Sequence, residues 1–314
     1  MNRTKTVTSK VTSLSDAVAG LIHDGDSVCL AGLTHLIPYA AAHEIIRQGK
    51  RDLELVRATP DLMCEQMLVV GILRKVVYSW AGNPGLGLLR VFRKAVEQGR
   101  IETEEYTHYG LVARLTAGAM HLPFFPMRSM MGTDLPRVNP NIKSVSDPYT
   151  GETLPVVPAL NPDVTVIHAQ RCDLQGNAHL WGFLGEVKEA AFAAKRLIVT
   201  AEEIVDSSVI LSDPNRVLMP SFMVHAVVAV PWGAHPSYAL GYYDRDNPFY
   251  QEWSRFATDE ERLKAWVADH VLGTRDHEAY LDKIGRARLE ALRVPEKLAA
   301  PVNYGIYTSE ALAR

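Results

Sequence analysis

The sequence predicts an α/β protein with a doubly wound, mostly parallel open sheet. Short apolar runs rich in β-branched residues alternate with amphipathic segments along most of the 314 residues. This alternation favours parallel strands joined by helices that cover both faces of a sheet. A hydrophobic content of 47% and a charged content of 22% are typical of a globular protein with a sizeable core. We therefore expect a single domain over residues 1–314.

Prolines and glycines mark the ends of the expected elements in the first part of the chain. Pro38 suits the first turn of a helix, and Gly49 and Gly99 suit the residue after the last turn. The expected strands are residues 27–31, 53–57 and 75–80. The expected helices are residues 38–48, 86–98 and 109–120. Strand and helix therefore alternate, as a parallel sheet requires.

Residues 123–162 interrupt this alternation, because they are rich in proline and glycine and show little periodicity. The segment also contains Phe124, Phe125, Met130 and Met131, which a solvated linker would not need. We interpret it as an irregular excursion that decorates the sheet.

The alternation resumes after the excursion. The expected elements are strands at 164–168, 197–200 and 224–230, with a helix at 186–195. The run 224–230 is the clearest candidate for a central strand, because it is apolar and rich in valine. Residues 259–314 are expected to form a helical C-terminal part, charged on one face.

Charge and cysteine content exclude several classes of partner. The net charge is −3, and no basic stripe predicts binding to nucleic acid or to an anionic membrane. The three cysteines are widely spaced without a CxxC pair, which fits a reducing compartment. The N-terminal residues are polar and basic rather than signal-like, and no apolar run approaches the roughly 20 residues that span a bilayer. We expect a cytoplasmic protein.

The common cofactor and metal motifs are absent from the sequence. The glycines of residues 82–87 stand in the wrong order for a dinucleotide-binding loop, and a proline lies among them. There is no P-loop and no GxSxG nucleophile elbow. The histidines form no HxxxH or HExxH pair, so no metal site is expected.

Two stretches carry more information than these motifs. Residues 24–38 predict a turn, a buried strand and a glycine-bearing loop that leads into a helix. Such a loop presents backbone N–H groups at a strand end, which suits a carboxylate or an oxyanion, although an ordinary strand-to-helix turn has the same pattern. In residues 161–178, a buried strand ends in polar residues, and Asp173 and Asn177 can fix a tight turn.

Together these stretches resemble the α subunits of the family I CoA-transferases. The first matches the family's Asp-Gly, apolar strand, Gly-Gly-Phe and following proline, and the second resembles its "DVAIIHA…D…GN" stretch. Further matches to the α subunit of glutaconate CoA-transferase follow in the same order at residues 37–41, 122–126, 232–237 and 243–249. The chain departs from the pattern at Ala31-Gly32-Leu33 and at residues 34–37, where the family meets its substrate. The resemblance therefore leaves the acid substrate open.

The resemblance implies the α subunit of a heteromeric enzyme that moves CoA from an acyl-CoA to a carboxylic or dicarboxylic acid. In this ping-pong reaction a glutamate attacks the thioester, an acyl anhydride forms, and CoA then passes through an enzyme thioester to the second acid. That glutamate belongs to the β subunit in two-chain members. Glu186 is the nearest candidate here, but it opens a helix with the wrong neighbours, so no catalytic residue is expected in this chain. The CoA thioester is a substrate, and no permanently bound cofactor is expected.

Two alternatives remain open from the sequence. The same scaffold resembles ring-opening hydrolases and a decarboxylase of CoA esters that lack the partner glutamate, and there Glu105 or His108 would act. The acids of residues 102–105 are also explained as the charged first turn of a helix. A non-catalytic sugar-phosphate-binding module is the other class, but it predicts an attached DNA-binding segment that the sequence lacks.

The resemblance and the strand ends together give a set of expected substrate-binding residues. They are Gly32, Leu33, Thr34, His35, Trp80, Asn83, Gly132, Thr133, Asp134 and Gln170. Gly32 is expected to offer its N–H at close range, and Thr34 or His35 to bind a distal carboxylate. The simpler interpretations are an exposed loop histidine at His35 and a plain turn at residues 132–134.

Overall fold

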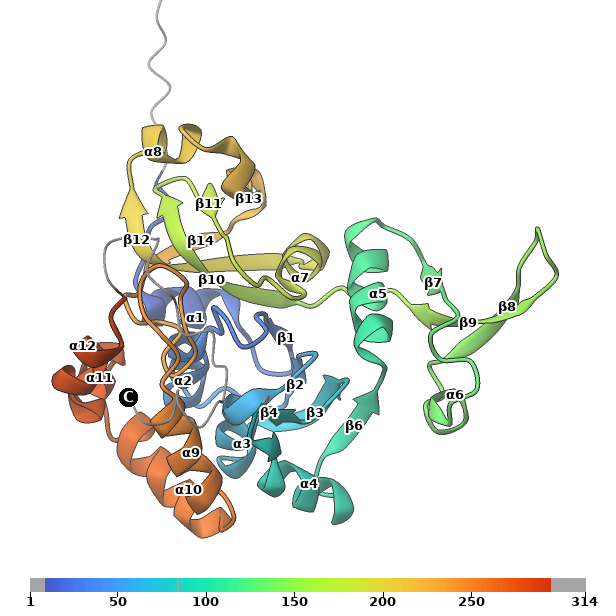
Figure 1. The fold of residues 1–314 in the computed structure, drawn as a ribbon, viewed down its shortest axis with the longest axis horizontal. Helices are drawn as coiled ribbons and strands as arrows, with labels where there is room; N and C mark the ends of the chain where they lie inside the picture. Colours follow the sequence, from blue (N-terminus) through green and yellow to red (C-terminus); the bar gives the residue numbers. More distant parts are fainter. Residues whose placement is uncertain (1–8, 84, 295–314) are drawn as a thin grey trace, which may run out of the picture.

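A nine-stranded sheet runs through the body of the molecule (Figure 1). Its parallel strands lie in the order β14 (Ala226–Ala229), β12 (Arg196–Val205), β10 (Val164–Asp173), β1 (Ser27–Leu30), β2 (Leu53–Val56), β3 (Leu73–Tyr78) and β6 (Glu102–Glu105). The short strands β11 (Ala178–His179) and β13 (Val217–Met219) extend the sheet in antiparallel pairing. The computed structural model describes residues 9–83 and 85–294. The mostly parallel α/β sheet predicted from the sequence is confirmed.

Helices cover both faces of the sheet, because side chains alternate between the two faces along each strand. In β1, Val28 and Leu30 belong to one apolar cluster and Cys29 to the other. The first cluster includes residues of α1 (Leu14–Leu21), α2 (Tyr39–Arg47), α3 (Asp61–Val69), α4 (Arg90–Glu97), α9 (Asn247–Phe256) and α10 (Glu260–Val267). The second includes residues of α5 (His108–Ala119), α7 (Val187–Ala193), α11 (His277–Ile284) and α12 (Arg286–Leu292).

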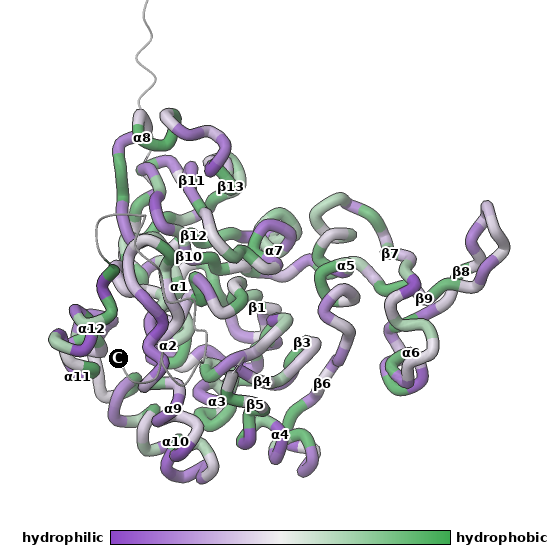
Figure 2. Tube along the Cα trace, viewed as in Figure 1, coloured by the Kyte–Doolittle hydropathy of each residue, from purple (hydrophilic) through white to green (hydrophobic). Residues whose placement is uncertain are grey.

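The excursion forms an arm that projects from the body beside α5 (Figure 1). It consists of β7 (Phe124–Pro126), α6 (Leu135–Val138), β8 (Lys143–Ser146) and β9 (Thr153–Pro158), and the strands pair antiparallel in the order β7-β9-β8. Hydrophobic residues continue from α5 into the base of this arm (Figure 2). Val157 is fully buried, so the arm packs against the body rather than trailing from it.

Short elements complete the fold. They are β4 (Gly82–Asn83), β5 (Gly87–Leu88), α8 (Ser207–Leu211), the 3₁₀ turns η1 (Pro214–Arg216) and η2 (Ser221–Met223), and the π-helical turn η3 (Ala268–Leu272). The expected C-terminal helices are present as far as Leu292, and residues 295–314 of that expectation lie outside the described residues. No helix in the described ranges is both long and apolar enough to cross a membrane.

Three expectations about the elements are wrong. The helix expected at 86–98 begins only at Arg90, because residues 87–88 pair with β4. The run 224–230 supplies β14 at one end of the parallel strands, where it pairs with β12 and with the N-terminal Val11 rather than lying in the centre.

The third concerns the acids of residues 102–105, which form β6, an edge strand, instead of the first turn of a helix. Glu104 is buried, and its carboxylate contacts Lys75 and Arg114. The other acids of the strand are exposed, as charges on edge strands commonly are. The two cations, which come from β3 and α5, allow Glu104 to be buried in this strand.

Candidate active site

The loop 32–36 follows β1 at the carboxyl end of the sheet and has an unusual backbone. Gly32 has φ +136, and a Cβ at this position would lie 2.8 Å from the Leu36 carbonyl oxygen. Thr34 and Leu36 have φ values of 56 and 52. Such left-handed residues are strained, and they tighten the chain into a compact coil before α2. Glycine is therefore required at position 32.

Two segments that are distant in sequence hold this loop in place. Ser237 donates its hydroxyl to the Thr34 carbonyl at 2.7 Å, and the Leu36 N–H donates to the Tyr238 carbonyl at 2.9 Å. On the other side, the Cβ position of Gly182 lies 2.9 Å from the His35 ring. The loop therefore has its shape fixed before any substrate arrives.

His35 is fully buried and is part of this support. Its Nε2 accepts the Leu240 N–H at 3.1 Å, so its Nδ1 carries the proton that it donates to the Phe183 carbonyl at 2.9 Å. Burial lowers the pKa of His35 to about 4, so the ring is neutral. This corrects both expectations for His35, since it is not an exposed loop residue and has no ring nitrogen left for a carboxylate. Thr34, by contrast, is partly exposed.

Arg57 lies directly beneath the loop and was not predicted as a site residue. Its guanidinium contacts the Leu30 carbonyl and donates to the carbonyls of Gly32 at 2.7 Å and Thr59 at 3.1 Å. No carboxylate forms an ion pair with Arg57 in the part of the chain that the structure describes. The only sequence signal for it was an arginine at the end of an apolar run.

Anchoring the Gly32 carbonyl sets the direction of the N–H group that follows it. In a trans peptide the C=O and N–H point in opposite directions, so anchoring the Gly32 carbonyl on Arg57 directs the Leu33 N–H away from the guanidinium. Within the described ranges, the N–H groups of residues 32–35 donate to no protein acceptor. Free N–H donors above a buried positive charge favour a carboxylate or an oxyanion.

A polar cluster lies where three neighbouring strands end. Thr59 follows β2, Ser79 follows β3 and His108 follows β6. Thr59 Oγ1 lies 3.2 Å from His108 Nε2, and Ser79 Oγ lies 2.9 Å from His108 Nδ1. Thr59 is buried and His108 is exposed, so the cluster reaches from the core to the surface.

A pocket of about 230 Å³ adjoins this cluster. Its lining residues come mainly from the end of β3 and from α4, and they are Tyr78, Ser79, Trp80, Ala81, Leu88, Phe92, Arg93, Val96, Glu97 and Glu105. The Tyr78 hydroxyl donates to Glu105 at 3.3 Å, and burial together with this carboxylate raises the pKa of Tyr78. Trp80 lies on the wall as expected for a site residue, with its ring against Gly82.

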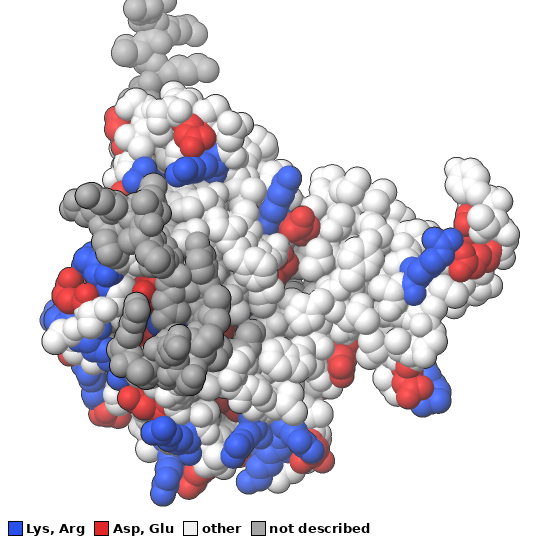
Figure 3. All heavy atoms as spheres, in the orientation of Figure 1, with Lys and Arg blue, Asp and Glu red and all other residues white. Residues whose placement is uncertain are grey.

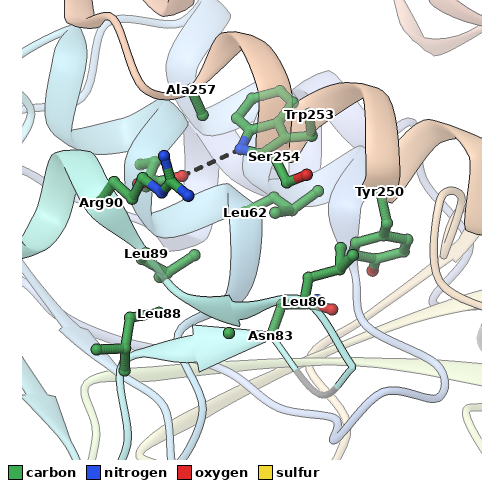
Figure 4. Close-up of a pocket in the computed structure, with 12 residues that line it drawn as sticks. Leu62, Asn83, Leu86, Leu88, Leu89, Arg90, Tyr250, Trp253, Ser254 and Ala257 are labelled. Atoms are coloured by element: carbon green, nitrogen blue, oxygen red, sulfur yellow. Dashed lines mark hydrogen bonds between the residues drawn. The ribbon is translucent and has the colours of Figure 1, made fainter. Parts of the chain in front are cut away.

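Two expected residues are structural in this fold. The Asn83 amide donates to Asp61 at 2.7 Å and its oxygen accepts from Arg245, so its side chain is committed to a buried cluster. Asn83 lies on the wall of a second pocket of about 80 Å³, where Trp253 also lies (Figure 4). Gln170 does not end its strand, since β10 continues to Asp173, and its amide is bonded to the Trp181 backbone.

The expected residues Gly132, Thr133 and Asp134 lie exposed in the arm, before α6. The arm touches the site region nearby, where Ser129 lies 3.4 Å from Thr107 at the start of α5. In the view of Figure 3, few charged side chains lie between the arm and the body. The arm therefore meets the body near the start of α5, and the side-chain contacts of Thr133 and Asp134 in the described ranges stay within the arm. No group of three or more potential metal ligands occurs among the described residues.

Comparisons with known proteins agree with this architecture. The coenzyme A transferase family model matches residues 11–230. The chain is 51% identical over 284 residues to the α subunit of 3-oxoadipate CoA-transferase from Pseudomonas knackmussii, covering 89% of this chain and 100% of that protein. It is 30% identical over 299 residues to the cholesterol ring-cleaving hydrolase IpdA subunit of Mycobacterium tuberculosis, covering 89% of this chain and 99% of that one.

A solved structure matches the fold closely. The crystal structure of glutaconate coenzyme A-transferase from Acidaminococcus fermentans superposes with a TM-score of 0.87 and 34% identity, covering 91% of this chain and 96% of that chain. The similarity extends beyond the sheet to most of the described residues. The chain therefore belongs to the family I coenzyme A transferases, as an α subunit.

Proposed function

We propose that this α subunit works with a β subunit to pass CoA from an acyl-CoA to a dicarboxylic 3-oxo acid such as 3-oxoadipate. The observation that carries the proposal is the 51% identity to the α subunit of 3-oxoadipate CoA-transferase along that protein's full length. The identity to glutaconate CoA-transferase is lower, at 34%. The changed loop sequence Leu33–Ile37 also supports an acid other than glutaconate.

The nucleophilic glutamate is expected on the partner chain. Glu186, the nearest match in this chain to the family's glutamate setting, is only 2% exposed at the start of α7, which argues against it as the nucleophile. When the partner's carboxylate attacks the thioester carbonyl, a C–O bond forms, negative charge develops on the carbonyl oxygen, and the C–S bond then breaks to release the thiolate. The N–H groups of Leu33 and Thr34, which donate to no protein acceptor in the described ranges, can donate hydrogen bonds to that oxygen.

Intact-mass spectrometry of this chain purified with its natural partner tests the proposal. Incubation with acyl-CoA esters, without an acceptor acid, is expected to add the mass of CoA to the partner chain, and replacing the partner's nucleophilic glutamate by glutamine is expected to remove that adduct. Adding 3-oxoadipate is expected to discharge it as a new thioester. A partner that is never modified, in a complex that transfers no CoA, contradicts the proposal.

A second function has one observation in its favour. Glu105 is exposed at the pocket by β3, and the similarity to the ring-cleaving hydrolase subunit covers most of both chains. In a hydrolase or decarboxylase, the ester is consumed without a CoA adduct and without an acceptor acid. Conversion that depends on Glu105, tested with Glu105→Gln, would then replace the transferase assignment.

A further inference from the structure

Thr59, Ser79 and His108 form a side-chain cluster that the proposed transfer step does not use. We propose that Thr59 and His108 bind the distal carboxylate of the acceptor acid and so select dicarboxylic over monocarboxylic acids. This inference rests on the proposed function and names the specificity-determining residues of the same site. It is carried by the convergence of the three side chains, with separations of 3.2 Å and 2.9 Å to the two nitrogens of one ring.

The hydrogen bonds of the cluster assign the tautomer of His108. The Ser79 hydroxyl donates to the Ala58 carbonyl at 2.6 Å, and a hydroxyl has one proton. The Ser79 oxygen therefore accepts the Nδ1–H of His108. Nε2 is left with a lone pair, to which the Thr59 hydroxyl donates. Ser79 is thus a positioning residue that orients the ring.

The hydrogen bond between Thr59 and His108 can be replaced by hydrogen bonds from both residues to an anion. The Thr59 hydroxyl can rotate toward one oxygen of an incoming carboxylate. The imidazole, after taking one proton from solvent, can donate from Nε2 to the other oxygen, and the negative charge of the acid favours that protonation. His108 is exposed and, among the described residues, has no acidic partner. Its ring nitrogens bond to hydroxyl groups, which can rotate, whereas those of the buried His35 bond to backbone groups that cannot.

Charges around the cluster favour an anion at Thr59. The guanidinium of Arg57 donates to the Thr59 carbonyl at 3.1 Å, so a buried positive charge lies directly below. Glu105, a carboxylate on the same edge, works against this attraction, and the Tyr78 hydroxyl donates to it at 3.3 Å. The same guanidinium donates to the Gly32 carbonyl at 2.7 Å. One cation therefore contacts both the loop, which faces the reacting carbonyl, and the cluster, which is proposed to bind the distal carboxylate. An acid with a carboxylate at each end matches this layout.

Steady-state kinetics of the two-subunit complex with two acceptor acids test the inference. The acids are 3-oxoadipate and 3-oxohexanoate, which share a chain length but differ in the distal carboxylate. For His108→Asn and Thr59→Val we expect KM for 3-oxoadipate to rise roughly ten- to hundredfold, as for a lost hydrogen bond to a charged group, while kcat changes little. The constants for 3-oxohexanoate are expected to stay unchanged. His121→Asn is the matched control, because His121 is an exposed histidine just beyond the other end of α5.

Two results would overturn the inference. One is an equal loss with both acids, and the other is an unchanged KM for 3-oxoadipate in both variants. If the wild-type complex transfers CoA to neither acid, the proposed function fails, and NMR of the histidine rings in that complex decides the inference separately. A shift of the His108 resonance with adipate but not with hexanoate supports it, and no shift with either rejects it.

Discussion

The two ends of the candidate site differ in how their polar groups are held. Hydrogen bonds to Ser237, Tyr238 and Phe183, which are distant in sequence, fix the loop 32–36, and His35 in this loop is buried. The cluster of Thr59, Ser79 and His108 runs from a buried threonine to an exposed histidine, and hydrogen bonds between its side chains and one from Ser79 to the Ala58 carbonyl hold it. The loop cannot change its donors without moving backbone, whereas the cluster can change partners by rotating a hydroxyl.

This difference matches two different tasks. Stabilising a charge that develops during reaction requires donors that are already in place, because moving them would cost free energy at the moment of reaction. Selecting among acids requires groups whose hydrogen bonds can be given up and replaced by the ligand's. We therefore assign the chemistry that every substrate shares to the loop, and the choice of acceptor acid to the cluster.

Gly32→Ala is expected to cause the largest loss of kcat, because it distorts the backbone of the loop 32–36. The added Cβ meets the Leu36 and His35 carbonyls at 2.8 and 2.9 Å, and the φ of +136 disfavours any side chain. Misplaced N–H donors should lower kcat by about a hundred- to thousandfold, as for a lost oxyanion donor. Gly20→Ala, where no atom lies within 4 Å of the new Cβ, should leave kcat unchanged. A Gly32→Ala complex with normal kcat would remove the loop from the chemistry.

Arg57→Met is the next strongest test, since it removes the group that joins the two ends. Three carbonyl oxygens lose their shared donor, which should lower the free energy of unfolding by about 2–3 kcal/mol. Urea unfolding of the purified complex measures this loss. Arg57→Lys should recover part of the stability but less of the transfer rate, because one ammonium cannot bind three carbonyls in a planar fork. Full activity in Arg57→Met would show that the buried charge is not used.

The free energy of unfolding should depend on pH through the buried His35 of the loop. The pKa of His35 is about 4 when folded and about 6.5 when unfolded, so the unfolded chain binds more protons below pH 6.5. Stability from this residue is complete above that pH and falls as the pH drops toward 4, by about 1–2 kcal/mol between pH 7.5 and 5.5.

Burial lowers the pKa of His277 to about 3, so this residue adds to the same slope. Urea midpoints measured across that pH range for wild type and His35→Gln provide the comparison. A variant with the same slope as wild type would mean that His35 does not titrate as its burial requires.

The loop 32–36 could be predicted from the sequence, but the residues that fix it could not, because they are distant in sequence. A buried strand, a glycine and a helix-opening Pro38 are neighbours in sequence, so the pattern of residues 27–38 predicts a loop with free N–H groups. Phe183 and Tyr238, which fix the loop, lie more than a hundred residues away, and no local pattern pairs them with it. The burial of His35 follows from those contacts, which is why its expected exposure is wrong.

His108 was predicted only as a catalytic residue of the hydrolase alternative, and its grouping with Thr59 and Ser79 was missed because the three come from separate strand ends. Thr59, Ser79 and His108 are ordinary residues in their local sequence, and only the strand order β2-β3-β6 brings them together. The acids of residues 102–105 were predicted wrongly, since a charged first turn and an edge strand with cationic neighbours share one sequence pattern. Strand order, which sequence leaves undetermined, decided both outcomes.

Tyr78→Phe should have the smallest effect, and it sharpens the boundary between the cluster and the neighbouring pocket. The lost hydrogen bond to Glu105 should cost about 0.5–1 kcal/mol of stability. If transfer uses only the loop and the cluster, both Tyr78→Phe and Glu105→Gln should keep kcat and the preference for 3-oxoadipate over 3-oxohexanoate. A large loss of turnover in Glu105→Gln alone would place a reacting carboxylate in this chain. The division of tasks between loop and cluster would then have to include Glu105, as the hydrolase alternative requires.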